Sequence, residues 1–187
     1  MTPRGFAGRA AAERLGGSGG GRWFGVGHSP IVSCRPLLAR LANGHRYSRH
    51  MTPDQQELFD AARAIQQRAH APYSHYKVGA ALRTASGAIY SGCNVENAAY
   101  PQGCCAEASA ISAMVGAGEH QIVEVLVVAD GDRLASCCGG CRQRIREFAA
   151  LDTPIHTCGP DGIRLTLTLD QLLPYSFGPD NLEGFVS

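Results

Sequence analysis

The sequence has 187 residues, of which 44% are hydrophobic and 18% are charged, and its formal net charge is +1. These values are typical of one folded domain with a tail, and we expect no second catalytic domain. No run approaches the roughly 18 apolar residues that span a bilayer, so we expect no membrane-spanning segment and no membrane partner.

The charge is distributed unevenly along the chain. Residues 1–50 contain eight arginines and a single acid, Glu13, whereas residues 51–187 contain 9 basic and 15 acidic residues. Nucleic-acid-binding proteins present a basic surface to the phosphate backbone, so the acidic body argues against a nucleic-acid partner. A small neutral substrate suits this body better.

Residues 1–50 are rich in Gly, Arg, Ala and Ser and show neither helical nor strand periodicity. We expect them to form a disordered N-terminal extension before a folded domain at residues 51–187. Two other interpretations stay open. The Arg-rich, acid-poor composition is also that of a targeting peptide, and a translation start assigned upstream of a true start at Met51 would leave the same kind of segment.

The first predicted element of the domain is a helix over about 54–69. Thr52-Pro53-Asp54 is a helix-start pattern, and apolar residues then recur at helical spacing. Two short runs follow, residues 78–84 and 88–95, in which apolar residues are continuous or alternate. The turn-forming Ala85-Ser86-Gly87 separates them, so we expect a β-hairpin.

Further elements are predicted downstream of the hairpin. Helix formers fill residues 106–115, a continuous apolar run at 123–129 predicts a strand, and residues 142–149 are helical again. Short strands are expected at 154–158 and 163–169. This alternation predicts an α/β fold, a three-layer α/β/α sandwich around a mixed sheet of about five strands.

Cysteines are the most informative residues of the chain. The sequence has eight, and they bunch as Cys104-Cys105 and Cys137-Cys138-x-x-Cys141 instead of spreading as a disulfide framework does. We find no secretory signal before them and expect the chain to be intracellular, and clustered thiols in such a chain indicate a metal site.

Two cysteine motifs open predicted helices. Cys105-Ala106-Glu107 opens one and Cys138-Gly139-Gly140-Cys141 opens another, so three thiolates can converge where two helix N-termini meet. Unpaired backbone N–H groups and the helix dipole stabilise thiolates there. A catalytic zinc takes three protein ligands and leaves a fourth position for water, whereas a structural zinc takes four. Glu107 lies two residues beyond Cys105, where its carboxylate can shuttle protons.

This pattern resembles the signature of zinc deaminases, in which ligand-x-Glu is followed by Pro-Cys-x-x-Cys, although Cys137 stands where proline is usual. Over about residues 51–183 the chain resembles the cytidine deaminase family in its small homotetrameric form. The other segments that carry the resemblance are Pro72-Tyr73-Ser74-His75-Tyr76 with Val78-Gly79-Ala80-Ala81-Leu82, Gly92-Cys93-Asn94-Val95-Glu96-Asn97-Ala98, Cys141-Arg142-Gln143 and Leu172-Leu173-Pro174-Tyr175-Ser176-Phe177-Gly178-Pro179.

The resemblance implies a metal, a base and a reaction. One Zn²⁺ per subunit would be held by Cys105, Cys138 and Cys141, and Glu107 would act as general base and acid. The implied reaction is hydrolytic deamination of cytidine and 2'-deoxycytidine to uridine and 2'-deoxyuridine plus ammonia. This is a step of pyrimidine salvage, and we expect it in the cytoplasm.

The resemblance also implies how a nucleoside is bound. Asn94 and Glu96 would hydrogen-bond the ribose hydroxyls. Tyr76 would pack near the base, and Ala106 would contact the substrate. Phe177 would reach into the pocket of a neighbouring subunit of a homotetramer.

Two residues depart from the family's pattern. Ala108 follows the glutamate where tetrameric relatives typically have arginine. Another group, such as Arg142, Gln143 or the helix N-termini, should therefore offset the charge of three thiolates. Cys137 replaces proline, and by resemblance its carbonyl would still accept a hydrogen bond from the amino group of the substrate.

Three alternatives stay open. In the first, the thiols would form a structural zinc site with a fourth ligand from the set Cys93, Cys104, Cys137 and Cys158. In the second, the chain would be a zinc-stabilised binding module without turnover. In the third, the same chemistry would act on a polynucleotide or a cytosine-containing antibiotic. Editing enzymes, however, need a basic channel, and this body is acidic.

Overall fold

The computed structural model describes residues 51–182. The predicted disordered extension, residues 1–50, lies outside this described part of the chain. Within residues 51–182, no helix combines the length and the apolar character that crossing a bilayer requires.

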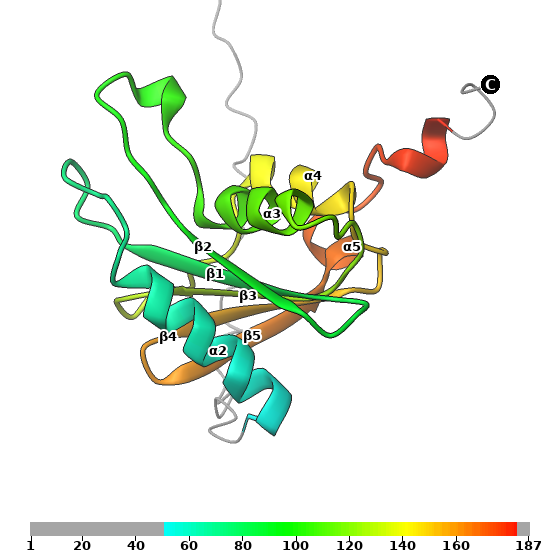
Figure 1. The fold of residues 1–187 in the computed structure, drawn as a ribbon, viewed down its shortest axis with the longest axis horizontal. Coiled ribbons are helices and arrows are strands. Elements are labelled where there is room, and N and C mark those ends of the chain that lie inside the picture. Colours follow the sequence, from blue (N-terminus) through cyan, green and yellow to red (C-terminus); the bar gives the residue numbers. More distant parts are fainter. Residues whose placement is uncertain (1–50, 183–187) are drawn as a thin grey trace, which may run out of the picture. The chain divides into compact units, whose positions relative to one another are not determined.

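A five-stranded sheet forms the centre of the domain (Figure 1). Its strands are β1 (Val78–Thr84), β2 (Ile89–Cys93), β3 (Ile122–Ala129), β4 (Pro154–Gly159) and β5 (Gly162–Thr168). In space their order is β2-β1-β3-β4-β5. β3 and β4 run parallel, and the other neighbouring strands are antiparallel. The sheet is therefore mixed, and its β1–β2 hairpin is the predicted one.

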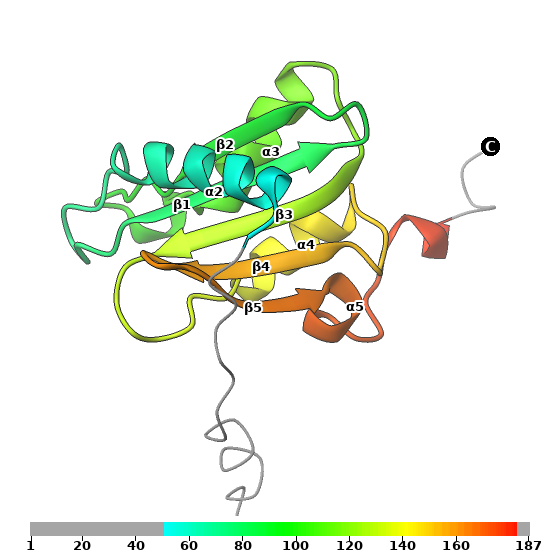
Figure 2. The ribbon, with the colours of Figure 1, turned by 90° about the horizontal axis from the view of Figure 1, so that it is seen from below.

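Helices cover both faces of the sheet, which confirms the predicted α/β/α sandwich. α2 (Pro53–Gln66) lies on one face, whereas α3 (Ala106–Gly116) and α4 (Gly139–Arg146) lie on the other (Figure 2). Successive strand residues point to opposite faces, so each central strand supplies both cores. In β3, Leu126 packs toward α2 and Val127 packs toward α3 and α4.

Local composition explains where the helices begin. α2 begins after Thr52, which forms a capping box with Gln55. α4 begins at Gly139, three residues before the predicted start, because the low helix propensity of Gly139 and Gly140 conceals its first turn in the sequence. The sequence did not predict three short elements, η1 (Tyr100–Gln102), α5 (Leu169–Leu172) and η2 (Pro179–Leu182).

Glycines in the first two strands let helices approach the sheet closely. A Cβ at Gly92 in β2 would lie 2.3 Å from the backbone nitrogen of Ala110 and 2.6 Å from the carbonyl oxygen of Ala106. A Cβ at Gly79 in β1 would lie 2.1 Å from the carbonyl oxygen of Ala62 in α2. Any side chain at Gly92 would therefore push the N-terminal half of α3 away from the sheet.

Candidate active site

Three cysteine thiols converge where the N-termini of α3 and α4 meet. Cys105 is the N-cap of α3, Cys138 is the N-cap of α4, and Cys141 lies in the first turn of α4. Their Sγ atoms all lie within 4.8 Å of one another, and those of Cys105 and Cys138 are 3.8 Å apart. The structure thus brings together the three cysteines that the sequence motifs singled out.

The thiols influence one another's protonation. Burial and the neighbouring Cys138 raise the pKa of the Cys105 thiol. Burial and the charge of Glu107 raise the pKa of the Cys141 thiol. Burial opposes ionisation at Cys138 as well, but hydrogen bonds from the backbone N–H and thiol of Cys141 outweigh it, and the pKa of Cys138 is lowered. Three sulfurs this close ionise together only beside a cation, so the donor set fits a zinc ion.

Among the described residues, the group of possible metal ligands has three members. Cys93, Cys104 and Cys158 lie outside it. Cys137 also lies outside it. Its thiol is buried near the Glu107 carboxylate, and burial together with this negative charge raises the pKa of the thiol. A structural zinc site takes four protein ligands, so the geometry argues against that alternative and matches a catalytic site with an open position.

Glu107 lies in the first turn of α3, and only 5% of its surface is exposed. It lines a cavity of about 270 Å³, the inner pocket, together with Cys105 and Cys138. The inner pocket is also lined by predicted substrate-binding residues, namely Tyr76, Asn94, Glu96 and Ala106. One cavity is therefore lined by two of the three clustered cysteines, the buried carboxylate and four of the five residues expected to bind substrate.

Asn94 fixes the entry into β1. Its Oδ1 accepts a hydrogen bond from the backbone N–H of Val78 at 2.8 Å, and its Nδ2 donates to the carbonyl of Tyr76 at 2.9 Å. These bonds hold the amide at the wall of the inner pocket and tie the backbone of Tyr76 to β2. The Oδ1 atom can accept one more hydrogen bond, and the Nδ2 atom can donate one more, so both remain available to a ligand.

Glu96 holds the turn that precedes β1. Its carboxylate accepts hydrogen bonds from the backbone N–H of Tyr73 at 2.9 Å and from the hydroxyl of Ser74. These bonds, with that of Ser74 first, lower the pKa of Glu96, so the carboxylate is an anion at neutral pH. Sequence reasoning missed Ser74 because its partner lies 22 residues away, in a different loop.

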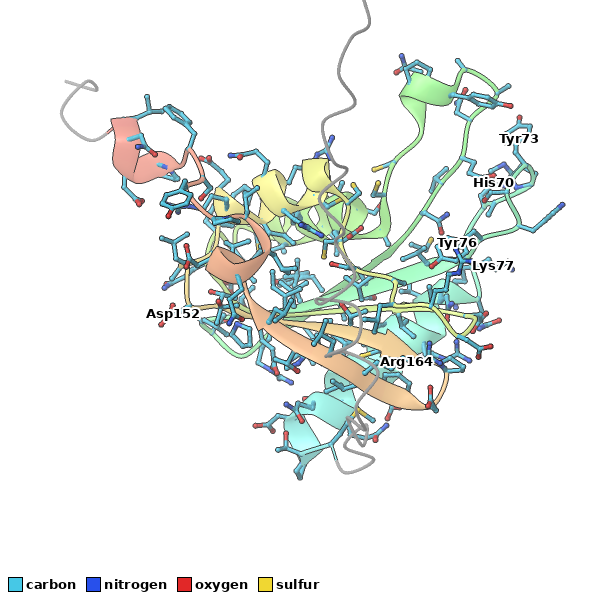
Figure 3. All side chains as sticks on the ribbon, turned by 180° about the vertical axis from the view of Figure 1, so that it is seen from behind. His70, Tyr73, Tyr76, Lys77, Asp152 and Arg164 are labelled. Carbon is cyan, nitrogen blue, oxygen red and sulfur yellow. The ribbon has the colours of Figure 1, made fainter. Side chains whose placement is uncertain are left out.

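An outer cavity of about 570 Å³ adjoins the inner pocket. The residues that line both are Ser74, Asn94, Glu96 and Cys105. Its walls include Tyr73 and Tyr100, whose rings meet edge to face with centroids 6.0 Å apart. Figure 3 shows Tyr73 at the outer end of the loop before β1, with Tyr76 and Lys77 nearer the strand. Two loops that are distant in sequence therefore form the mouth of the site.

Phe177 does not line the inner pocket or the outer cavity of its own chain. It lies in a segment that runs away from α5 and the sheet (Figures 1 and 2), and 60% of its surface is exposed. The predicted contact of Phe177 with a neighbouring subunit stays a prediction.

Arg142 fixes the loop before α4, a role that the sequence did not reveal. Its guanidinium donates to the carbonyl of Cys137 at 2.9 Å, to the carbonyl of Leu172 at 2.8 Å and to the hydroxyl of Ser136 at 3.2 Å. The Cys137 carbonyl thus already accepts one hydrogen bond, from Arg142, and has one lone pair left. This lone pair could accept the hydrogen bond expected from the amino group of the substrate. The sequence signal for Arg142 was its place in the Cys141-Arg142-Gln143 motif.

Comparison with protein families agrees with this geometry. A family model described as the cytidine and deoxycytidylate deaminase zinc-binding region matches residues 52–157, more than half of the chain. The chain belongs to the cytidine deaminase family. The matched region contains the three clustered cysteines and Glu107. The expected family, and the expectation that the chain is an enzyme of it, are confirmed.

Individual cytidine deaminases are similar over most of their length. That of Sporosarcina psychrophila is 37% identical over 130 residues, which cover 70% of this chain and 96% of the relative. The probable cytidine deaminase of Dictyostelium discoideum is 39% identical over 133 residues, covering 69% of this chain and 89% of the relative. The crystal structure of the Burkholderia pseudomallei cytidine deaminase matches with a TM-score of 0.63 at 36% identity, covering 68% of this chain and 100% of that one.

Proposed function

We propose that this chain is a zinc-dependent hydrolase that deaminates cytidine and 2'-deoxycytidine to uridine and 2'-deoxyuridine plus ammonia. The observation that carries the proposal is the inner pocket, where clustered sulfurs, a buried carboxylate and two sugar-binding candidates line one cavity. Family membership supports cytidine as substrate, since similar relatives carry that name. The reaction would serve pyrimidine salvage in the cytoplasm, and the free thiols of the described cysteines suit a reducing compartment.

One Zn²⁺ per subunit would be held by Cys105, Cys138 and Cys141. When bound, zinc lowers the pKa of a coordinated water toward ~7 and so supplies a nucleophile near neutral pH. The helix N-termini are the best-supported groups to offset the thiolate charge, because the backbone N–H of Cys141 bonds the sulfur of Cys138. Arg142 and Gln143 donate to backbone carbonyls and a hydroxyl instead.

Glu107 would move the protons of the reaction. Its carboxylate takes a proton from the attacking water and delivers it to ring N3, and the second proton of that water then leaves with the amino group as ammonia. Water and cytidine are thereby converted to uridine and ammonia. The burial of Glu107 limits proton exchange with bulk solvent.

The charge of the site favours a nucleoside over a nucleotide. The family model also covers deoxycytidylate deaminases, so this distinction matters. Among the described residues that line the inner pocket and the outer cavity, Glu96 and Glu107 are the charged ones, and both are acidic. A phosphate near the mouth would be repelled by the ionised Glu96. The volume of the outer cavity leaves room for ribose or 2'-deoxyribose.

The bound nucleoside would be oriented by four side chains and closed in by a fifth. Asn94 and Glu96 would hydrogen-bond the sugar hydroxyls, Tyr76 would pack near the base, and Ala106 would contact the substrate from the start of α3. Phe177 of a neighbouring subunit would complete the site in a homotetramer. The position of Phe177 supports this part, because its side chain is largely exposed and lines neither cavity of its own chain, so it is free to contact another subunit.

The test is an ultraviolet assay of cytidine, 2'-deoxycytidine and cytidine 5'-monophosphate with the full chain, with zinc quantified on the same sample. Turnover of both nucleosides, loss of turnover in Glu107→Ala with zinc retained, and weak use of the nucleotide are expected. Bound zinc without turnover of either nucleoside would contradict the proposal and favour a binding module or another cytosine substrate.

A further inference from the structure

Polar side chains of α4 hold the C-terminal arm, defined as residues 173–182. Arg142 Nη1 donates to the carbonyl of Leu172, just before the arm, at 2.8 Å. Gln143 Nε2, one residue further on, donates to the carbonyl of Phe177 at 2.9 Å. The helix that carries two of the three clustered sulfurs therefore also holds the backbone of Phe177.

Arg146 contacts the arm on both sides of Phe177. Its side chain is 6% exposed, its Nε donates to the hydroxyl of Ser176 at 3.3 Å, and its Nη2 forms an ion pair with the carboxylate of Asp180. The guanidinium also lies against Gly178, where a Cβ would be 2.4 Å from Arg146 Cζ. The absence of a side chain at Gly178 lets the arm pass over the guanidinium, so the residues that flank Phe177 are fixed.

The arm presents its aromatic rings outward while its backbone is held. Phe177 is largely exposed, and Tyr175, whose φ is 55°, is fully exposed. The arm runs away from α5 and the sheet (Figures 1 and 2). Holding a segment in its bound conformation lowers the entropy lost on association, so a fixed backbone beneath an exposed ring suits insertion into a partner.

We propose that Arg146 and Gln143 are positioning residues, which orient the C-terminal arm so that Phe177 enters the pocket of a second copy of this chain. The inference rests on the proposed function, in which Phe177 completes a neighbour's site. It adds that α4, whose start carries two of the three candidate metal ligands of one subunit, also sets the substrate affinity of the next. Asp180 is the exposed end of the ion pair, with 65% of its side chain accessible, and can be changed without altering α4.

The first experiment compares Asp180→Ala and Gln143→Ala with the wild-type chain. Each variant should raise KM for cytidine about threefold to tenfold, as expected when an aromatic contact is loosened, with kcat changed by less than about twofold. The matched control is Asp130→Ala, which removes a carboxylate of similar exposure from an ion pair with Arg63 at 2.8 Å and should leave KM unchanged. An unchanged KM in both arm variants would overturn this proposal, whereas a wild-type chain without turnover would refute the proposed function instead.

Subunit mixing then tests whether the effect passes between chains. Arg146→Met keeps an apolar stem but releases the arm, and it retains Glu107. Glu107→Gln lacks the base but keeps the held arm. In hybrid oligomers, verified by native mass spectrometry, the pocket of an Arg146→Met subunit receives an arm from a Glu107→Gln subunit, so KM should return toward the wild-type value. A KM that stays at the level of the Arg146→Met protein alone would overturn the proposal, because the defect would then lie within one chain.

Discussion

Acidic groups gather where two helices begin: the thiols of Cys105, Cys138 and Cys141 cluster there, and the Glu107 carboxylate lines the inner pocket with the first two. Ala108 follows Glu107 and is half-buried in the groove between α3 and α4. An arginine there would bring a cation near the thiolates and stabilise the deprotonated nucleophile. Ala108→Arg should therefore shift the acid limb of the pH profile of kcat/KM for cytidine to lower pH, by about one unit or less because the position is partly exposed to solvent.

The control for this substitution is Ser112→Arg, which adds the same charge one helical turn further along the same groove. Its distance from the sulfurs is greater, so the shift should be smaller. Equal shifts in the two variants would mean that the added charge acts on the whole protein. An unshifted profile in Ala108→Arg would mean that the helix N-termini already compensate fully.

The thiols also predict how stability depends on pH in the metal-free protein. Folding raises the pKa of Cys105 and Cys141, mainly through burial, whereas it lowers that of Cys138. A thiol whose pKa is raised on folding contributes stability that is fully present below the unfolded pKa, about 8.5, and is lost as pH rises through the folded pKa. The large rise at Cys141 outweighs the fall at Cys138, so the metal-free protein should lose stability above about pH 8.5.

Tm measured at about pH 7.5 and about pH 9.5, with and without a chelator, tests this expectation. The chelated protein should show the larger fall, because thiolates bound to zinc are ionised at both pH values. Cys158 is buried beneath α2, and its pKa is raised to about 12. Its effect on stability is the same with and without zinc, so it does not contribute to the difference between the two falls in Tm. An equal fall of Tm with and without chelator would contradict the prediction.

At the scale of secondary-structure elements, the contact of α3 with β2 sets the position of Glu107, the proposed general base. Gly92→Ala would force a Cβ into the backbone of α3, so the helix must move and carry Cys105 and Glu107 with it. We expect a loss of about 1–3 kcal/mol in the free energy of unfolding, as for other overpacked sites, and a lower kcat of the folded protein. Urea unfolding and the cytidine assay measure the two effects.

Gly79→Ala is the matched control, since it crowds α2, a helix that carries none of the candidate site residues. It should destabilise the protein to a similar extent and leave kcat per folded molecule unchanged. A wild-type kcat in Gly92→Ala would mean that the position of α3 tolerates the shift. The two variants together separate stability from site geometry.

Local sequence patterns were sufficient for most of the elements. The hairpin, α3 and the later strands follow from periodicity and turn residues, which act over a few neighbours. The metal cluster was also predictable, because its ligands stand at helix starts that motifs mark. Long-range contacts were not: the bonds of Asn94 to the backbone before β1 depend on how two strands pair, and the contacts of Arg146 join residues 30 or more positions apart.

At the scale of the whole molecule, the charge divides the chain in two. Residues 1–50 contain eight basic residues and one acidic residue, whereas residues 51–187 contain 9 and 15. The family match begins at residue 52, and Met51 packs against the core between α2 and the sheet. The described residues 51–182 contain every candidate site residue and two packed core clusters. We therefore propose residues 51–187 as the deaminase domain.

A chain that begins at Met51 should accordingly fold and deaminate cytidine with a kcat/KM within about twofold of the full chain, because it keeps every residue to which the proposed reaction gives a role. Its affinity for polyanions should fall, since the eight arginines of residues 1–50 are lost and the remaining body is acidic. Parallel measurements of kcat/KM, Tm and elution from a heparin column compare the two chains. A shortened chain that is unfolded or inactive would show that residues before Met51 belong to the domain. Equal elution of both chains would mean that those arginines are not available to a polyanion.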